Sequence, residues 1–414
     1  MSHEYNANLK IDVKSKFINV DMEMTYCSLE EDKEEVIFYL YHELEIEKLK
    51  GKRIKSYIIE AEKFNCSSFN YPGQKVKVML DKPLAKGDKL NIEMSYSGHF
   101  NSKGIKFEGG EDQEIIQLNR IENGFVELGM YAPWFPFFEN YLEPAIFNLN
   151  IVIDDGYKVV SRPQVIKDNG NYIIEQEDPF GDCTIIAFNN FKCFEFNNAD
   201  IKSSVYYINE EHKETAINSK ELTEKLINYY NSQFGKTARD RVNIVITPRK
   251  NGGHYCRPGL LVYSAEIAGS SELKLFRNLG HEIAHFWWNK AEFTSWEDWL
   301  NESFANYSVL KAVRNYYGID KYNEIIDKYQ ENAKNLPPIR GLKRDTSQET
   351  FLTLYCKGTL KLLELEKMLG ESKQLKLLRK VHQNEIKTTS EFLELLRNFS
   401  STQIAEKFNK MLDD

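Results

Sequence analysis

The spacing of apolar residues changes from a period of two to a helical period near residue 200, and this change constrains the fold more than any other feature. Before it, apolar and polar residues alternate over residues 8–13, 75–78 and 90–94. Such alternation indicates half-buried strands. Further β-rich runs cover residues 35–41, 145–153, 172–175 and 184–188. Many short strands separated by turns predict an antiparallel β-sandwich or saddle over residues 1–200.

The second half of the chain has a mostly helical pattern. Residues 213–233 predict a helix that stops at Gly235, and residues 242–246 and 260–263 predict strands. Further helices are predicted over residues 273–289, 298–317, 321–332 and 351–369, with shorter ones to the end. Strands and helices in this order predict an α+β domain over residues 201–414. Two domains also agree with the length of 414 residues.

Composition and charge argue against several classes of protein. The formal net charge is -8 and Lys and Arg are scattered, which argues against nucleic acid as a partner. No apolar run approaches the length of a membrane span, and the amino terminus lacks the apolar core of a secretory signal. The six cysteines form no CxxC pair and are too sparse for a disulfide scaffold. We therefore expect a cytoplasmic protein with reduced thiols and no membrane partner.

A five-residue motif with metal-binding geometry lies on one of the predicted helices. Residues 281–285 read HEIAH. Residues four apart stack on one helix face, so the imidazoles of His281 and His285 can reach one Zn²⁺. Glu282 lies beside them, where it can accept a proton from a metal-bound water. The alternative is a chance match that leaves two surface histidines on a helix.

A third ligand is needed, because a catalytic zinc takes three protein ligands and keeps one position open. Residues 299–305, WLNESFA, fall on the next predicted helix and include Glu302. Sixteen residues separate His285 from Glu302, enough to finish one helix and turn. If the two helices pack antiparallel, Glu302 projects back towards the histidines. The alternative for Glu302 is a solvated carboxylate on a helix face.

Together, HEIAH and WLNESFA resemble the zinc aminopeptidases related to alanyl aminopeptidase and leukotriene A4 hydrolase, which are gluzincins. The family pattern has eighteen residues before its Glu and reads WLNEGFA, so this chain is two residues shorter there. The resemblance implies a thermolysin-like α+β catalytic domain with one Zn²⁺ held by His281, His285 and Glu302. It implies Glu282 as the general base. Glu297 stands where the family usually has Asp, which implies a carboxylate that orients a ligand histidine.

A second stretch, residues 354–358, resembles the Y-x-K-G segment of the same family. In that segment a Tyr donates its hydroxyl to the oxyanion of the tetrahedral intermediate. The resemblance therefore implies that Tyr355 is catalytic, since a phenol aimed at developing negative charge stabilises it. The alternative for Tyr355 is an ordinary core aromatic residue.

A third stretch resembles the GxMEN strand of the family only in part. Gly252 and Gly253 fit close approach of a peptide backbone, which the resemblance implies for substrate binding. Tyr255 stands where the family has the Glu that binds a free amino group. Glu127, shortly before the stretch YAPWFP, is a candidate for a second amine-binding acid in some members. An ordinary loop carboxylate is the alternative for Glu127.

The resemblance implies zinc-dependent hydrolysis of peptide bonds, with removal of amino-terminal residues as the default activity. Because Tyr255 replaces the family Glu, a peptidase without strict amino-terminal anchoring stays open. A zinc-binding but catalytically idle peptide-binding protein is the alternative from another class. We expect a short form without the carboxy-terminal helical domain that most members carry. The expected partner is a peptide substrate, and the sequence predicts no oligomeric state.

Overall fold

The computed structural model describes most of the chain. The residues described are 2–66, 69–101, 105–106, 115–116, 118–138, 143–162, 164–176, 178–198, 201–251, 253–345 and 347–414. They form two compact units that divide at Lys192 and Cys193, except that a short segment starting at Thr247 joins the first unit. The predicted domains, residues 1–200 and 201–414, divide the chain close to this point.

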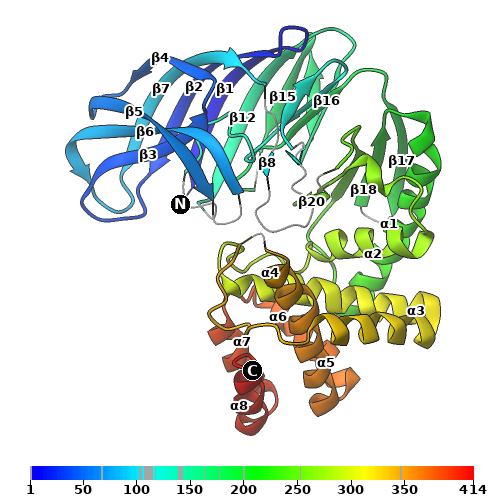
Figure 1. The fold of residues 1–414 in the computed structure, drawn as a ribbon. Coiled ribbons are helices and arrows are strands. Elements are labelled where there is room, and N and C mark those ends of the chain that lie inside the picture. The colour runs from blue at the N-terminus through cyan, green and yellow to red at the C-terminus, as the bar shows by residue number, and fades with distance from the viewer. Residues whose placement is uncertain are drawn as a thin grey trace. The chain divides into compact units, whose positions relative to one another are not determined.

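The first unit is built from strands, as the alternating pattern predicts. Its largest sheet has seven strands in the order β14-β15-β12-β1-β2-β7-β4 (Figure 1). These strands are β1 (His3–Asp12), β2 (Phe17–Cys27), β4 (Leu44–Lys50), β7 (Lys89–His99), β12 (Ala145–Ile153), β14 (Val165–Asp168) and β15 (Asn171–Glu175). Buried and exposed residues alternate along β1, so one face of the sheet packs on the core and the other meets solvent.

Three smaller sheets complete this unit. The three-stranded sheet, in the order β3-β6-β5, consists of β3 (Lys33–Tyr41), β5 (Ile54–Cys66) and β6 (Phe69–Leu84). The four-stranded sheet, in the order β10-β11-β16-β13, consists of β10 (Arg120–Glu122), β11 (Phe125–Leu128), β13 (Lys158–Ser161) and β16 (Ile185–Phe188). The pair consists of β8 (Ile105–Lys106) and β9 (Ile115–Ile116).

One pair of neighbouring strands departs from the antiparallel pairing predicted for the first domain. Strands β1 and β12 lie side by side and run parallel, with His3 opposite Ala145 and Ile11 opposite Ile153. The connection between them spans most of the first unit, which leaves ample chain to return to the same end of the sheet. The seven-stranded sheet is therefore mixed.

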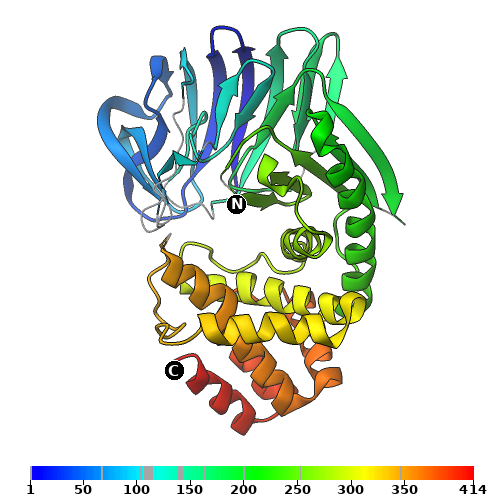
Figure 2. The ribbon, with the colours of Figure 1, turned by 45° about the vertical axis from the view of Figure 1, so that its right-hand side comes forward.

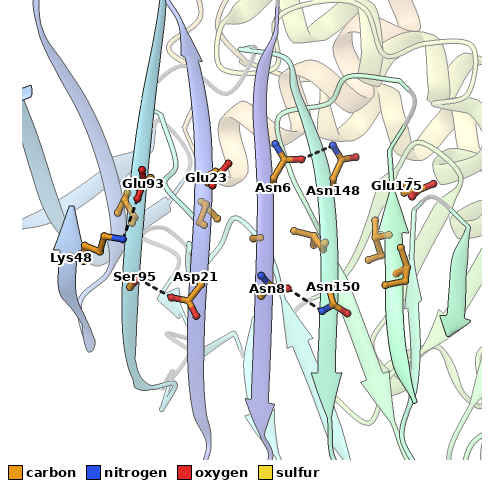
Figure 3. A pocket seen from close by; sticks show the side chains of 16 residues that line it. Asn6, Asn8, Asp21, Glu23, Lys48, Glu93, Ser95, Asn148, Asn150 and Glu175 are labelled. Atoms are coloured by element: carbon orange, nitrogen blue, oxygen red, sulfur yellow. Dashed lines mark hydrogen bonds and ion pairs between the residues drawn. The ribbon is translucent and has the colours of Figure 1, made fainter. Parts of the chain in front are cut away.

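The exposed face of the seven-stranded sheet carries a polar groove of about 470 Å³. Figure 3 shows side-chain amides paired across neighbouring strands, Asn6 with Asn148 and Asn8 with Asn150, each at 3.0 Å. Glu23 and Glu93 stand directly opposite each other in this groove. No histidine or cysteine lines it. This groove therefore lacks the histidines of the metal site that the sequence predicts.

The second unit contains a five-stranded sheet and the helices, so the predicted α+β class is confirmed. The sheet order is β17-β18-β19-β21-β20, in which β20 is an antiparallel end strand. The strands are β17 (Lys192–Asn198), β18 (Ile201–Tyr207), β19 (Arg241–Ile246), β20 (His254–Arg257) and β21 (Leu260–Tyr263). Strands β18, β19 and β21 are mutually parallel and almost entirely buried, as parallel strands usually are.

Eight α-helices accompany this sheet among the described residues. They are α1 (Lys213–Phe234), α2 (Glu272–Ala284), α3 (Trp299–Asn332), α4 (Gln348–Leu352), α5 (Gly358–Leu369), α6 (Glu371–Gln383), α7 (Thr389–Phe399) and α8 (Thr402–Met411). Helix α3 packs on α5, and α5 to α8 each pack on the next helix in the chain; helices α3 to α8 are coloured yellow to red in Figure 2. Shorter turns are η1 (Glu210–His212), η2 (Ala265–Ile267), η3 (Trp296–Asp298) and the π-helical turn η4 (Thr353–Lys357). None of the described helices has the length and apolar character needed to cross a membrane.

Two predicted helices differ from the structure. The helix predicted over residues 273–289 ends at Ala284, because Phe286, Trp287 and Trp288 are all buried. Three consecutive positions of an α-helix point about 100° apart and cannot all face one core, so the chain leaves the helix and turns. The helix predicted over residues 351–369 is divided by the π-helical turn η4.

Candidate metal centre and active site

Helix α2 carries the HEIAH motif in its last turn. The helix begins at Ser271, whose hydroxyl accepts a hydrogen bond from the main-chain nitrogen of Lys274 at 3.3 Å. Leu279 and Ile283 are completely buried and fix one face of the helix in the core. His281 and His285 consequently lie together on another face, with their Nε2 atoms 3.2 Å apart.

Helix α3 brings a carboxylate to the two histidines, as the sequence predicts. Oε2 of Glu302 lies 3.0 Å from Nε2 of His281 and 3.7 Å from Nε2 of His285. The three side chains are 12 to 15% exposed, so the cluster is shielded but accessible. Among the described residues, this is the one group of three His, Cys, Asp or Glu side chains close enough to hold a metal ion, with all ligand atoms within 4.8 Å.

The hydrogen bonds made by Nδ1 of each histidine show which ring nitrogen turns an unprotonated lone pair towards the cluster. Nδ1 of His281 lies 3.2 Å from the side-chain oxygen of Asn306, and Nδ1 of His285 lies 2.9 Å from the main-chain oxygen of Trp288. Both partners accept hydrogen bonds, so each Nδ1 carries the proton and each Nε2 is left without one.

Two imidazole lone pairs and a carboxylate therefore converge on one point. Oε2 of Glu302 is buried and has no well-formed hydrogen bond within the described part of the chain. Such a set of donors repels itself unless a cation lies between them. Two nitrogens and one oxygen are a donor set typical of catalytic zinc, which keeps its fourth position open. The residues present therefore fit a zinc ion.

The two carboxylates of the centre have opposite electrostatic environments. Burial raises the pKa of Glu282, and the neighbouring histidines reduce this rise only in part. Burial also acts on Glu302, but positive charge on His285 and His281, present when these rings are protonated, outweighs it and lowers the pKa of Glu302 to about 2. Glu302 therefore stays a carboxylate, whereas Glu282 is shifted towards accepting a proton.

Tyr355 lies on the π-helical turn η4, directly over the metal cluster. Its ring stacks on that of His281 at 5.1 Å between centroids and on that of Phe351 at 4.0 Å. Its hydroxyl hydrogen-bonds the carboxylate of Glu302. Burial, together with the charge of Glu302, raises the pKa of the phenol well above its usual range, so the hydroxyl keeps its proton and acts as a donor. The structure thus brings the predicted oxyanion donor to the predicted ligands.

The prediction that Glu297 orients a ligand histidine is wrong. Its Oε2 accepts hydrogen bonds from the main-chain nitrogen of Thr389 at 2.7 Å and from the Thr389 hydroxyl at 2.6 Å. The second ring nitrogens of His281 and His285 are bound instead by Asn306 and by the carbonyl of Trp288. Asn306 is the functional residue that the sequence analysis missed. Its position, one helical turn after Glu302, is the signal that points to it.

The residues predicted to bind substrate in this part of the chain lie on β20 or just before it. Gly252 lies outside the described residues, and Gly253 has a φ of 60°. Tyr255 is 7% exposed, with the guanidinium of Arg257 4.7 Å from its ring centroid. Cys256 points to the other face of the strand. Burial first, and then the charges of Glu282 and Glu302, raise the pKa of the Cys256 thiol, so this side chain is electrostatically coupled to the acids of the centre.

The structure also argues against Glu127 as an exposed amine-binding acid. Glu127 lies on β11 in the first unit, and its Oε2 is 3.1 Å from Nε of Arg249. Neither side chain has any exposed surface. A buried carboxylate needs a positive partner, and Arg249 supplies it. Glu127 therefore belongs to a buried ion pair of the first unit.

The convergent His, His and Glu side chains are the ligand set typical of zinc metallopeptidases of the HExxH class. Residues 221–413 match the Peptidase family M1 domain. This part of the chain is therefore a family M1 domain, which agrees with the predicted resemblance to the gluzincin aminopeptidases. The solved structures described below are named zinc metallopeptidases, which agrees with the predicted cofactor, a single zinc ion. That His281, His285 and Glu302 bind it stays a prediction.

The curated relatives include proteins named aminopeptidases and one named a protease-interacting factor. "Probable aminopeptidase 1" of Sulfurisphaera tokodaii is 23% identical over 369 residues, covering 81% of this chain and 46% of that protein. "Tricorn protease-interacting factor F2" of Thermoplasma acidophilum is 25% identical over 268 residues, covering 58% of this chain and 34% of that protein. The chain thus spans less than half the length of these relatives.

Solved structures resemble the whole chain. One is a mutant of a two-domain M1 zinc metallopeptidase bound to L-tryptophan, with a TM-score of 0.74, 16% identity and coverage of 99% of this chain and 94% of that one. Another is a mutant M1 zinc metallopeptidase of Deinococcus radiodurans bound to a Tyr-Ser-Ala substrate, with a TM-score of 0.73, 15% identity and coverage of 100% and 93%. At these identities the likeness shows the fold, which is the predicted two-part architecture.

Proposed function

We propose that this chain is a zinc-dependent peptidase that hydrolyses peptide bonds, with removal of amino-terminal residues as its default activity. The observation that carries the proposal is the convergence of His281, His285 and Glu302, with Glu282 and Tyr355 beside them. The family M1 domain and the similarity to named aminopeptidases support the same activity.

The residues of the centre divide the chemistry between them. Glu282 accepts the proton of the attacking water and passes it to the leaving amine, for which its raised pKa suits it. Tyr355 donates its hydroxyl to the oxygen of the scissile carbonyl as negative charge develops there. Zinc, when bound, supplies Lewis acidity and a more acidic water. His281, His285 and Glu302 hold it, and the hydrogen bonds to Nδ1 of both histidines keep their rings aimed at it.

A peptidase without strict amino-terminal anchoring is the second candidate, and specific observations favour it. Tyr255, which stands where the family has its amine-binding Glu, is a tyrosine that is 7% exposed. Glu127, the candidate for a second amine-binding acid, is already paired with Arg249. Neither offers a free negative charge to an ammonium group. Main-chain pairing of a peptide at Gly252 and Gly253 stays a prediction from the family resemblance.

One pair of substrates separates the two candidates. The same peptide is supplied with a free amino terminus and with an acetylated one, and cleavage is followed by mass spectrometry. Strict anchoring predicts that acetylation abolishes cleavage. Equal rates for both forms would exclude amino-terminal anchoring and leave the less selective peptidase.

Substitution of the acids tests the mechanism and the catalytically idle alternative. Glu282→Gln is expected to keep one zinc per chain while kcat falls by about 10²- to 10⁴-fold, because only the base is lost. The matched control, Glu302→Gln, is expected to lose zinc as well. If the wild-type protein binds zinc but hydrolyses no member of a peptide library, the idle peptide-binding protein is the correct reading.

We also propose a cytoplasmic location. Five of the six cysteines, Cys27, Cys183, Cys193, Cys256 and Cys356, are reduced thiols in the structure, which agrees with a reducing compartment.

A further inference from the structure

Asn306 contacts both a predicted zinc ligand, His281, and the turn that carries Tyr355. It lies on α3 four residues after Glu302, so both side chains project from the same face of the helix. Its Oδ1 is 3.2 Å from Nδ1 of His281, and its Nδ2 donates to the main-chain oxygen of Tyr355 at 3.1 Å. The side chain is 8% exposed, which makes these two contacts its main polar partners.

The polarity of this bridge is determined by its partner on the tyrosine side. A main-chain carbonyl only accepts, so the amide must turn its NH₂ group to Tyr355. The amide oxygen is then left for His281, whose Nδ1 must donate. The lone pair of His281 consequently faces Glu302 and His285. The carbonyl of Tyr355 thus selects, through Asn306, the tautomer of His281 that binds a metal.

The turn that carries Tyr355 needs support from α3, because a π-helical turn departs from the regular hydrogen-bond pattern of the helix. Ser303 donates to the main-chain oxygen of Leu354 at 2.6 Å, and Thr359 donates to that of Tyr355 at 2.7 Å. A Cβ at Gly358 would lie 2.0 Å from Oγ of Ser303, so α3 and the turn are in close contact. Ser303 therefore holds the same turn as Asn306, through a hydrogen bond that involves no predicted metal ligand.

We propose that Asn306 is a positioning residue that links zinc binding by His281 to the placement of Tyr355. The inference rests on the proposed function and extends it. With both bonds made, the His281 ring and the Tyr355 turn are held by one side chain, and their rings stay stacked at 5.1 Å. The amide is essential because no other side chain of this size offers one acceptor and one donor in fixed positions.

Three variants of the full chain separate the two contacts. Asn306→Ala removes both. Asn306→Asp keeps an acceptor for His281 but turns a second acceptor to the carbonyl of Tyr355. Ser303→Ala is the matched control, since it weakens the grip on the turn and leaves His281 untouched.

Zinc affinity is measured by competition with a chromogenic chelator, and kcat and KM are measured on the zinc-loaded proteins. We expect Asn306→Ala to weaken zinc binding by about 10- to 100-fold, as loss of a bond to a ligand histidine does. Asn306→Asp and Ser303→Ala are expected to stay within about threefold of wild type in zinc affinity while kcat falls about 10-fold or more, because the tyrosine is misplaced.

Three results would contradict the proposed link between zinc binding by His281 and the placement of Tyr355. Zinc affinity of Asn306→Ala equal to that of wild type would remove the role at His281. An equal loss of zinc in Ser303→Ala would show that the fold alone is affected, and an unchanged kcat in Asn306→Asp would remove the role at Tyr355. A wild-type chain that binds no zinc would instead refute the proposed function, which keeps the two failures distinct.

Discussion

The carboxylate of Glu297 accepts two hydrogen bonds from Thr389, one from the main chain and one from the hydroxyl, at 2.7 and 2.6 Å. The Thr389 hydroxyl in turn accepts from the indole of Trp299 at 2.8 Å. Because Thr389 begins α7, Glu297 also places a negative charge at a helix amino terminus. This arrangement ties the start of α3 to α7 and gives Glu297 a structural role.

Glu297→Ala is therefore expected to lower the free energy of unfolding by about 2 to 3 kcal/mol, because charge-assisted hydrogen bonds are lost and a buried hydroxyl loses a partner. Zinc affinity is expected to stay unchanged. Glu292→Ala is a matched control on the same loop, since the exposed Glu292 side chain accepts a hydrogen bond from the Thr294 hydroxyl and its removal is expected to cost less than about 0.5 kcal/mol. Urea unfolding followed by circular dichroism measures both, and a loss of zinc in Glu297→Ala would contradict the structural role.

Removal of zinc is expected to lower the stability of the second unit. The metal binds the folded chain and neutralises three mutually facing donors, so a zinc concentration 1,000 times its dissociation constant adds about 4 kcal/mol. Thermal unfolding with and without a chelator measures this difference. A His281→Ala/His285→Ala variant serves as the control and is expected to show no shift on chelation. A chelator effect of the same size in that variant would place the metal elsewhere.

Tyr355→Phe is expected to reduce kcat by about 10²- to 10³-fold, as loss of one oxyanion donor does, with little change in KM. The ring, its stacking on His281 and the turn are retained, so zinc affinity is expected to be preserved. Steady-state kinetics together with metal analysis checks both quantities. A kcat close to that of wild type would show that Tyr355 is an ordinary core aromatic residue, which is the alternative interpretation.

A buried lysine makes part of the stability dependent on pH. Lys311 is 3% exposed, and its Nζ lies 3.1 Å from Oε1 of Glu366 and also contacts Glu371. The bond from Lys311 lowers the pKa of Glu371 in the folded state. A depressed pKa contributes stability that is present above the unfolded-state pKa and is lost as the pH falls through the folded-state pKa.

We therefore expect the free energy of unfolding to fall between about pH 5 and pH 3. Lys311→Met is expected to destabilise the protein at pH 7 by about 3 to 5 kcal/mol, because Glu366 loses its buried partner, and to flatten this acid dependence. Denaturant unfolding at several pH values measures both effects. If the stability of Lys311→Met falls equally steeply in acid, other carboxylates cause the pH dependence.

The local elements follow from the sequence where one physical pattern dominates. Alternation along residues 8–13 predicts β1, and the helix predicted over residues 213–233 agrees with α1 to within one residue. Prediction failed where tertiary packing outweighs the pattern. The buried residues Phe286, Trp287 and Trp288 end α2 early, and the turn around Tyr355 is π-helical because Ser303 and Asn306 bond its carbonyls.

The sequence by itself determined which side chains belong together in the centre, because the four-residue spacing of His281 and His285 is a property of any α-helix. It also identified Glu302 and Tyr355 through segments whose residue types fit the same chemistry. Only the tertiary structure decided what the remaining carboxylates do: Glu297 bonds Thr389, and Glu127 pairs with Arg249. A carboxylate takes the nearest donor or cation in space, and residues 92 and 122 positions apart in the chain meet only when the fold brings them together.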